Sequence, residues 1–333
     1  MGKKMGEIAV TDVSGIRTVF MGSPDFAVPF LSALVDRGFD LRGVVTQPDR
    51  PRGRGQVLTP VPVRAWALGK GIPAVAPPSL RVPDGRRFLR DWSPDLIVVV
   101  AYGKILPEEV LESPRWGCVN VHASLLPALR GASPIVWAIR NRLTVSGLSL
   151  MLLDRGMDTG PLLDRLEIPM GPNETSVSLS ERMIQKGPEF LLSGLERYLA
   201  GALRPFPQPA EGSLAPILRK EDGRLPLESS VLEVDAHVRA MNPWPGAIVG
   251  SSLGRIRIGS GRVLREDVPE PVAGRVLFQG PEGIDVACGK GVYRIHSLQR
   301  EGGRMLPVSE FLSGRKFGPG EVLDFASREP SGS

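Results

Sequence analysis

The segment Leu96-Ile97-Val98-Val99-Val100 constrains the fold of this chain more than any other, because it is an unbroken apolar run rich in β-branched residues. A strand with one solvated face would alternate polar and apolar side chains, whereas a continuous run is typical of a strand covered on both faces. Other short strands are expected at 18–21, 41–46, 119–122 and 149–153, with helical patterns between them. This alternation predicts a parallel, Rossmann-like α/β sheet.

The pattern changes after a long helix that we expect from Val177 to Leu199. Residues 204–209 are rich in proline, which cannot continue a helix. The short strands beyond them are punctuated by glycine, which favours a small β-barrel. The expected boundaries are a flexible extension at 1–15, a mostly parallel α/β domain at 16–203, a Pro-rich linker at 204–220, the barrel at 221–325 and a flexible tail at 326–333.

Composition argues against several classes of protein. No stretch approaches the roughly 20 apolar residues that a membrane span needs, so we expect no membrane partner. Residues 1–4 carry charge, but no apolar core follows them, so no secretory signal is expected. Cys118 and Cys288 lie far apart in strand-like runs, which matches neither a zinc motif nor a disulfide framework. Buried thiols, a cytoplasmic location and the absence of a bound metal are the simplest interpretation.

Charge and loop motifs narrow the possible partners. The net charge of +5 and the sequence pI of about 9.5 are compatible with a nucleic-acid partner, although modest basicity alone is common on solvated surfaces. No Walker A motif is present. The first strand-to-helix turn, Gly22-Ser23-Pro24-Asp25, lacks the Gly-x-Gly-x-x-Gly spacing, so a nicotinamide site is not expected.

The strongest functional signal is Asn120-Val121-His122 at the end of an expected strand. Period-two alternation places Asn120 and His122 on one face, and open parallel sheets bind ligands beyond the carboxyl ends of their strands. Asp158, in an Asp-Thr-Gly loop, is the candidate to join them. These side chains, with no nucleophilic Ser or Cys beside them, suit direct acyl transfer to an incoming amine. The alternative is a core histidine and a turn asparagine, and the Ser-Leu-Leu-Pro turn that follows makes this alternative less favourable.

These motifs carry a resemblance that runs from about Thr18 to about Leu323. The chain resembles the methionyl-tRNA formyltransferase family, a branch of the folate-dependent formyltransferases. The matching segments are Val19-Phe20-Met21-Gly22-Ser23-Pro24-Asp25-Phe26, Thr46-Gln47-Pro48-Asp49-Arg50-Pro51, Val99-Val100-Ala101-Tyr102-Gly103, Asn120-Val121-His122-Ala123-Ser124-Leu125-Leu126-Pro127, Met157-Asp158-Thr159-Gly160 and Asn242-Pro243-Trp244-Pro245.

The resemblance implies a reaction and a role for each motif. The reaction would be transfer of the formyl group of 10-formyltetrahydrofolate to the amine of methionyl-initiator tRNA, in the α/β domain, with an OB-like C-terminal barrel adding a tRNA contact. Asn120 and His122 would stabilise the oxyanion, and Asp158 would orient His122 and help to move the amine proton. The folate pocket would be lined by Tyr102, Gly103, Ile105, Leu106, Ser124, Leu125, Leu126 and Pro127. The tRNA would be bound by Arg50, Arg52, Arg54 and Arg130.

The sequence departs from the family pattern at two places. Gln56 and Val57 stand where two lysines are often found after the Gly-Arg-Gly loop, and Ala128 and Leu129 stand where Arg and Trp often precede Arg130-Gly131. Alternatives with the same chemistry are a sugar-nucleotide formyltransferase and a 10-formyltetrahydrofolate hydrolase. A catalytically silent RNA-binding protein is the alternative of another class. We expect a monomer that does not bind DNA.

Overall fold

The computed structural model describes residues 12–52, 57–267, 272–314 and 316–324. Most of the predicted N-terminal extension, the predicted tail and Arg54 therefore lie outside the described residues. The chain forms two compact units, which we describe separately. The first contains the residues up to Pro134, Val145–Pro169 and Ser180–Ala215, and the second contains Ile135–Thr144, Met170–Leu179 and the residues from Pro216 onward.

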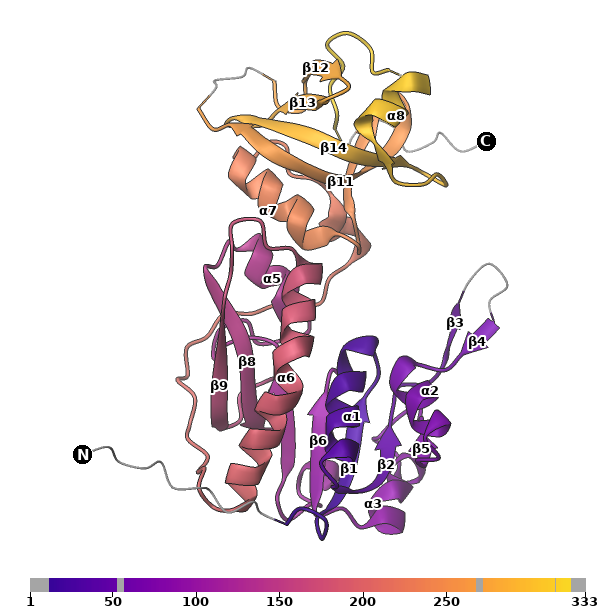
Figure 1. Ribbon diagram of the computed structural model, residues 1–333, viewed down its shortest axis with the longest axis vertical. Helices are drawn as coiled ribbons and strands as arrows, with labels where there is room; N and C mark the ends of the chain where they lie inside the picture. Colours follow the sequence, from indigo (N-terminus) through magenta and orange to yellow (C-terminus); the bar gives the residue numbers. More distant parts are fainter. Residues whose placement is uncertain (1–11, 53–56, 268–271, 315, 325–333) are drawn as a thin grey trace, which may run out of the picture. The chain divides into compact units, whose positions relative to one another are not determined.

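The first unit is built on a seven-stranded sheet with the order β5-β2-β1-β6-β7-β8-β9 (Figure 1). The first five strands in this order pair in parallel, and β8 and β9 continue the sheet antiparallel. Every residue of β6 is buried, as the apolar run predicts. The mostly parallel α/β sheet is thus confirmed. The strands are β1 Arg17–Gly22, β2 Asp40–Val45, β5 Ala74–Val75, β6 Leu96–Val100, β7 Cys118–His122, β8 Val145–Leu152 and β9 Leu162–Pro169.

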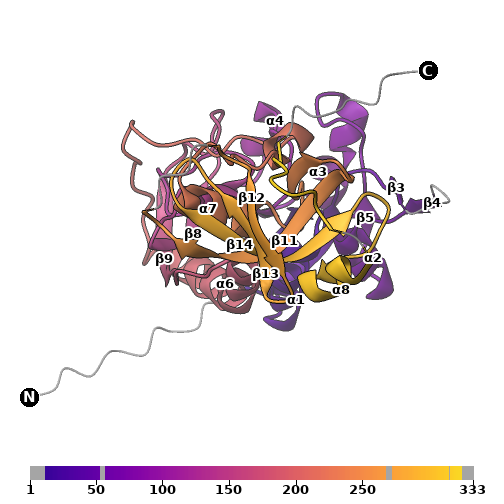
Figure 2. The ribbon, with the colours of Figure 1, turned by 90° about the horizontal axis from the view of Figure 1, so that it is seen from above.

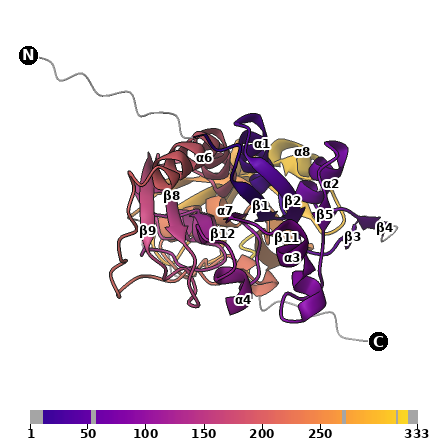
Figure 3. The same ribbon diagram turned by 90° about the horizontal axis from the view of Figure 1, so that it is seen from below.

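Helices cover both faces of this sheet. Seen from above and from below, α1 and α6 lie on one face and α3 and α4 on the other (Figures 2 and 3). A Cβ atom on Gly187 of α6 would lie 2.4 Å from a ring carbon of Phe30 of α1, so glycine lets these two helices approach closely. The helices are η1 Asp25–Ala27, α1 Val28–Asp36, α2 Pro62–Gly69, η2 Pro83–Arg86, α3 Arg87–Trp92, α4 Glu108–Leu111 and α6 Ser176–Leu199, whose first turn belongs to the second unit.

A short two-stranded ribbon projects from the first unit (Figure 1). Its strands, β3 Arg50–Arg52 and β4 Val57–Thr59, pair antiparallel. The Gly-Arg-Gly segment was expected in a loop, and the structure shows that residues 50–52 and 57–59 pair as strands.

The second unit is built on a six-stranded antiparallel sheet with the order β10-β11-β14-β13-β12 and β15 paired to β14. Backbone bridges from Asp324 to Gly250 and from Val322 to Arg275 join the two outer edges, so the sheet closes as the predicted barrel should. Closure removes unpaired strand edges. The elements are α5 Pro134–Arg140, η3 Lys220–Gly223, α7 Val231–Met241, β10 Ala247–Ser251, β11 Gly254–Arg265, β12 Val276–Gly280, β13 Gly283–Ala287, β14 Val292–Arg300, β15 Leu306–Pro307 and α8 Val308–Gly314.

Helix α7 shows how the sequence sets one of these elements. Ser230 and Glu233 form a reciprocal capping box at its start. Its apolar face joins the core of the barrel, and His237 on this helix is buried. A bilayer-spanning helix is not found among the helices that the structure describes.

Candidate active site

Strand β7 places Asn120 and His122 together at the carboxyl end of the parallel part of the sheet. The strand pairs in parallel with β6 and antiparallel with β8, and its residues alternate between the two faces. Asn120 is 8% exposed and His122 is 6% exposed. No hydrogen bond of the Asn120 side-chain amide to another described residue is found, so this amide is available as a donor.

Both ring nitrogens of His122 face hydrogen-bonding groups. Nε2 lies 2.9 Å from the carbonyl oxygen of Leu129, and Nδ1 lies 3.6 Å from Oδ2 of Asp158. A carbonyl oxygen can only accept, so Nε2 carries a proton. Nδ1 is the other ring nitrogen, and it faces the carboxylate of Asp158.

Asp158 reaches His122 from the loop between β8 and β9, as the Asp-Thr-Gly motif predicts. Its backbone has a φ of +55°, in the left-handed region that few residues other than glycine adopt. Its carboxylate accepts a hydrogen bond of 2.8 Å from the backbone N–H of Gly131. Its side chain is 16% exposed, so it stands between the protein interior and solvent.

The turn after His122 is held by two serines. The hydroxyl of Ser124 donates to the carbonyl of Ala128 at 2.6 Å, and Ser149 of β8 donates to the carbonyl of Ser124 and accepts from the N–H of Leu126. Ser124 and Leu126 are buried, while Leu125 and Pro127 are partly exposed. The hydroxyl of Ser124 thus serves the turn, and the exposed parts of the turn are its apolar side chains and backbone.

The predicted folate-lining segment after β6 divides into buried and exposed residues. Tyr102 and Leu106 are 2% and 6% exposed and belong to the hydrophobic core of the first unit. Burial raises the pKa of the Tyr102 hydroxyl to about 12. The backbone carbonyl of Tyr102 accepts a hydrogen bond from the side-chain amide of Gln47. Gly103, with a φ of +77°, and Ile105, which is 75% exposed, form the surface of this segment.

The four predicted tRNA-binding arginines do not share one environment. Arg50 and Arg52 lie on β3, where only their backbone is described, and Arg54 lies outside the described residues. Arg130 is only 9% exposed. Its guanidinium donates to the side chain of Gln208 and to the carbonyls of Pro209 and Ala210. Its donors are used inside the first unit, which argues against a direct contact with tRNA.

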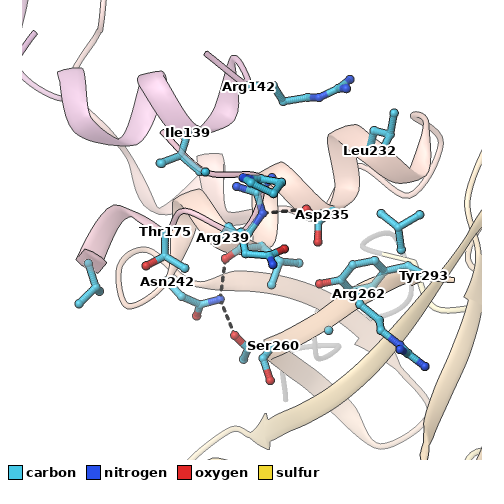
Figure 4. Close-up of a pocket in the computed structure, with 18 of the residues that line it drawn as sticks. Ile139, Arg142, Thr175, Leu232, Asp235, Arg239, Asn242, Ser260, Arg262 and Tyr293 are labelled. Atoms are coloured by element: carbon cyan, nitrogen blue, oxygen red, sulfur yellow. Dashed lines mark hydrogen bonds and ion pairs between the residues drawn. The ribbon is translucent and has the colours of Figure 1, made fainter. Parts of the chain in front are cut away.

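Metal ligands and cavities are the remaining features at which a ligand could bind. No group of His, Cys, Asp and Glu side chains that could hold a metal occurs within the described ranges. The second unit contains a cavity of about 980 Å³ between α7, β11 and residues 139–144 and 170–177 (Figure 4). Arg142 and Arg262 line it and are exposed, whereas Arg239 is paired with Asp235. None of the predicted site residues lines this cavity.

Comparison with known proteins identifies the family. The profile described as "Formyl transferase" matches residues 16–195, and the one described as "Formyl transferase, C-terminal domain" matches residues 217–316. The chain belongs to the formyl transferase family. Methionyl-tRNA formyltransferase of Myxococcus xanthus (strain DK1622) is 46% identical over 312 residues, 91% of this chain and 96% of that protein. Methionyl-tRNA formyltransferase of Xylella fastidiosa (strain M23) is 47% identical over 304 residues, 90% and 98% of the two chains.

Solved structures share the fold of this formyl transferase at lower identity. HypX from Aquifex aeolicus, in complex with tetrahydrofolic acid, has a TM-score of 0.61 at 21% identity. The match covers 91% of this chain but only 49% of HypX, so the chain spans about half of that protein. An N-formyltransferase from Helicobacter canadensis, in complex with folinic acid and dTDP-3-aminofucose, has a TM-score of 0.59 at 16% identity, covering 84% and 98% of the two chains.

The formyl transferase site contains residues that sequence reasoning missed. Gln208 donates to the carbonyls of Asp158 and Gly160, Ser149 holds the turn after His122, and Gly131 contacts the Asp158 carboxylate. Gln208 stands in the Pro-rich segment that was interpreted only as a linker. A polar side chain among prolines is a weak signal, because nothing in the sequence indicates which loops such a segment lies against.

Proposed function

We propose that this protein transfers the formyl group of 10-formyltetrahydrofolate to the free amine of methionyl-initiator tRNA, giving N-formylmethionyl-tRNA. The observation that carries the proposal is the set formed by Asn120, His122 and Asp158 at the end of β7, in a chain that matches methionyl-tRNA formyltransferases along nine-tenths of its length. The described residues offer a free amide donor, a histidine with one exchangeable nitrogen and a carboxylate beside it.

The segment after β6 and the turn after His122 suit a flat heterocycle. A pteridine needs an apolar surface and a few backbone hydrogen bonds. Exposed Ile105 and partly exposed Leu125 and Pro127 provide apolar surface, and the backbone of Gly103 is uncovered because that residue has no side chain. Tyr102 and Leu106 would support this surface from the core rather than touch the ligand with their side chains. When bound, the folate supplies the formyl group.

Asn120 is placed to stabilise the charge that develops during transfer. As the amine attacks the formyl carbon, negative charge grows on the formyl oxygen. Hydrogen-bond donors fixed in advance at that position lower the barrier, because they need not reorganise. The Asn120 amide meets this requirement, since it has no other partner among the described residues and its strand is paired on both sides.

His122 and Asp158 are placed to manage the proton of the amine. The attacking nitrogen must lose a proton, and the gap between Nδ1 of His122 and the Asp158 carboxylate is where it can be taken up. Once protonated, the imidazolium adds positive charge near the oxyanion. Collapse of the oxyanion would then break the bond between the formyl carbon and N10 of the folate, and the proton taken from the amine would pass to N10, so that tetrahydrofolate leaves. Nε2 keeps its proton and donates it in a hydrogen bond to the carbonyl of Leu129, which keeps the ring in one orientation.

Transfer without a covalent enzyme intermediate fits the neighbouring side chains. The hydroxyl of Ser124 donates to a backbone carbonyl and its residue is 1% exposed. Cys118 lies on the same strand as His122 but is buried, and burial raises the pKa of its thiol to about 12. Neither group is activated as a nucleophile, so the substrate amine attacks directly.

The tRNA would be held by basic side chains on both units. Strand β3 contains Arg50 and Arg52, and Arg54 follows them in the sequence. These three arginines would pair with phosphates of the acceptor arm. Arg142 and Arg262 at the cavity of the second unit offer two more exposed guanidinium groups. We propose that the protein acts as a cytoplasmic monomer, with no DNA or membrane partner and no bound metal.

One assay separates this function from its alternatives. The purified protein is incubated with 10-formyltetrahydrofolate and methionyl-tRNA, and N-formylmethionine is scored after ester hydrolysis. Parallel reactions contain no acceptor or a nucleotide-linked amino sugar. Formylation that depends on charged tRNA supports the proposal. Folate turnover without an acceptor would instead indicate a hydrolase, formylation of the sugar would indicate a sugar formyltransferase, and tRNA binding without turnover would indicate a silent RNA-binding protein.

A further inference from the structure

Residues 206–215, which follow the predicted end of the α/β domain, lie against the loops of the candidate active site. We refer to them as the strap. The backbone of Phe206 pairs with that of Leu162 at the start of β9, and Leu214 bridges to Arg130. The hydroxyl of Ser213 accepts from the N–H of Leu129 at 2.9 Å. All of these contacts lie within the first unit, so the strap is part of that unit rather than a free connection.

Gln208 is the residue of the strap that reaches the loop of Asp158. Its Nε2 donates to the carbonyl of Asp158 at 3.0 Å and to the carbonyl of Gly160 at 2.7 Å. Its Oε1 accepts from Nη2 of Arg130 at 3.0 Å and from Nε at 3.3 Å. The orientation of the amide is determined by its partners, because a guanidinium can only donate and a carbonyl can only accept.

These contacts connect to the reacting groups by a short route. Arg130 lies between Leu129, whose carbonyl accepts from His122, and Gly131, whose N–H donates to Asp158. Gln208 therefore holds the Asp158 loop from one side and the segment 129–131 from the other. Asp158 has a left-handed backbone, which aspartate tolerates better than most L residues, and the two hydrogen bonds from Gln208 hold the loop that contains it.

We propose, building on the function proposed above, that Gln208 is a positioning residue for formyl transfer. It clamps the Asp158 loop to Arg130, so that the Asp158 carboxylate stays beside Nδ1 of His122. Gln208 does not contact the substrates in this assignment. Arg130 is its partner in the clamp, and this role replaces the contact with tRNA predicted for Arg130 from the sequence.

The test measures kcat and KM separately in two variants. Gln208→Met keeps the size of the side chain and removes every hydrogen bond, whereas Gln208→Glu keeps the acceptor for Arg130 and removes both donors. We expect kcat to fall by about 10–10²-fold in each, since misplacement of a reacting group by about 1 Å has effects of this size. KM for the folate and for tRNA should stay within about twofold. Gln185→Met, on the exposed face of α6, is the matched control.

A double-mutant cycle distinguishes positioning from a general effect on stability. If Gln208 acts through Asp158, then Gln208→Met should reduce kcat little further in an Asp158→Asn background. Hydrogen exchange in the peptide covering 129–131 should be faster in both Gln208 variants than in the control, because the Gly131 N–H loses its fixed partner. This second measurement does not depend on activity.

Several results would overturn the assignment. One is a normal kcat in both Gln208 variants, and another is a kcat loss in the Asp158→Asn background that equals the product of the two single losses. A raised KM for tRNA as the main effect would also contradict it. Loss of folding in both variants would show that the contacts of Gln208 serve stability alone. The wild-type protein is assayed in parallel. If it does not formylate methionyl-tRNA, the proposed function fails and the exchange measurement alone decides the clamp.

Discussion

The backbone N–H of Gly131 lies 2.8 Å from the carboxylate of Asp158. Two residues earlier, the carbonyl of Leu129 accepts the proton on Nε2 of His122. One short segment of backbone thus fixes both partners of the proposed proton-transfer pair, and it does so without a side chain of its own. The separation of 3.6 Å between Nδ1 of His122 and Oδ2 of Asp158 follows from where this segment runs.

Gly131→Ala should therefore impair both stability and turnover. Gly131 has a φ of +117°, and an added Cβ would lie 2.7 Å from the carbonyl oxygen of Ala215. We expect a loss of about 1–3 kcal/mol in the free energy of unfolding, together with a lower kcat, because the segment must move away from the strap. Gly38→Ala is the control: its φ is +85° but no atom lies within 4 Å. Denaturant titration and steady-state kinetics of both variants check this. Equal effects of the two substitutions on kcat would contradict it.

Asn120→Ala should lower turnover by about 10²–10³-fold, the usual loss when one donor to an oxyanion is removed. His122→Ala should lower it by about 10²–10⁴-fold, the usual contribution of a group that takes up a proton. The double variant should be little slower than either single one if the two residues act as a unit. Binding of the folate, measured by fluorescence or calorimetry, should change little, since both side chains lie at the reacting end. A purified variant with near-normal turnover would remove that residue from the mechanism.

The sequence predicts the site through the periodicity of its strands. The apolar run at 96–100 determines a central strand, and alternation then places Asn120 and His122 on one face at a strand end, which the structure shows. The placement of Asp158 beside His122 also follows the motif order. The positions agree with the structure because strand alternation is a local rule, while the roles assigned to these residues stay predictions.

The parts that the sequence does not predict depend on contacts between distant segments. Gln208 is 50 residues from the carbonyl it holds at Asp158, and the Pro-rich pattern around it indicates only that no helix continues. An aromatic residue between prolines, such as Trp244, is expected to pack into the protein, yet Trp244 is 54% exposed. Burial of one side chain in an irregular segment is set by the tertiary arrangement, which no local pattern encodes.

Truncation should reveal that the strap belongs to the first unit. A chain ending at Leu203 lacks Gln208 and the backbone partners of Arg130, whereas a chain ending at Ala215 keeps them. We expect the longer piece to have the higher melting temperature and to bind the folate. It should bind tRNA more weakly than the full chain, because the second contact surface is lost. Thermal unfolding, folate titration and tRNA titration of the two pieces measure this. Equal melting temperatures would show that the strap adds nothing, and full tRNA affinity would exclude the second unit from binding.

His237 should make stability fall in mild acid. Burial on α7, assisted by Arg140, lowers the pKa of His237 from 6.5 to about 4. Above pH 6.5 the residue is neutral in both states, so its full contribution is present. As the pH falls from about 6.5 to about 4, the unfolded chain gains a proton that the folded chain does not, and up to about 3 kcal/mol is lost. In His237→Leu the free energy of unfolding should vary less over this range. Burial also lowers the pKa of the less buried His296, so His296→Leu should flatten the pH dependence less than His237→Leu does. Identical slopes in wild type and His237→Leu would contradict the prediction.

The arginines of the β3–β4 ribbon should contribute to tRNA affinity through phosphate contacts. Each contact releases condensed counterions, so the affinity depends on salt. Replacing Arg50, Arg52 and Arg54 by alanine should raise KM for tRNA and flatten the salt dependence by up to about one slope unit per lost contact. KM for the folate should hardly change, because the proposed folate surface lies on other loops. The Gln56-Val57 departure removes two lysines from this ribbon, so the exposed pair Arg142 and Arg262 of the second unit is the informative comparison. Titrating tRNA at two salt concentrations compares the two surfaces. If the triple variant keeps wild-type affinity and slope while the Arg142→Ala, Arg262→Ala variant binds tRNA more weakly, the main electrostatic contact lies on the second unit.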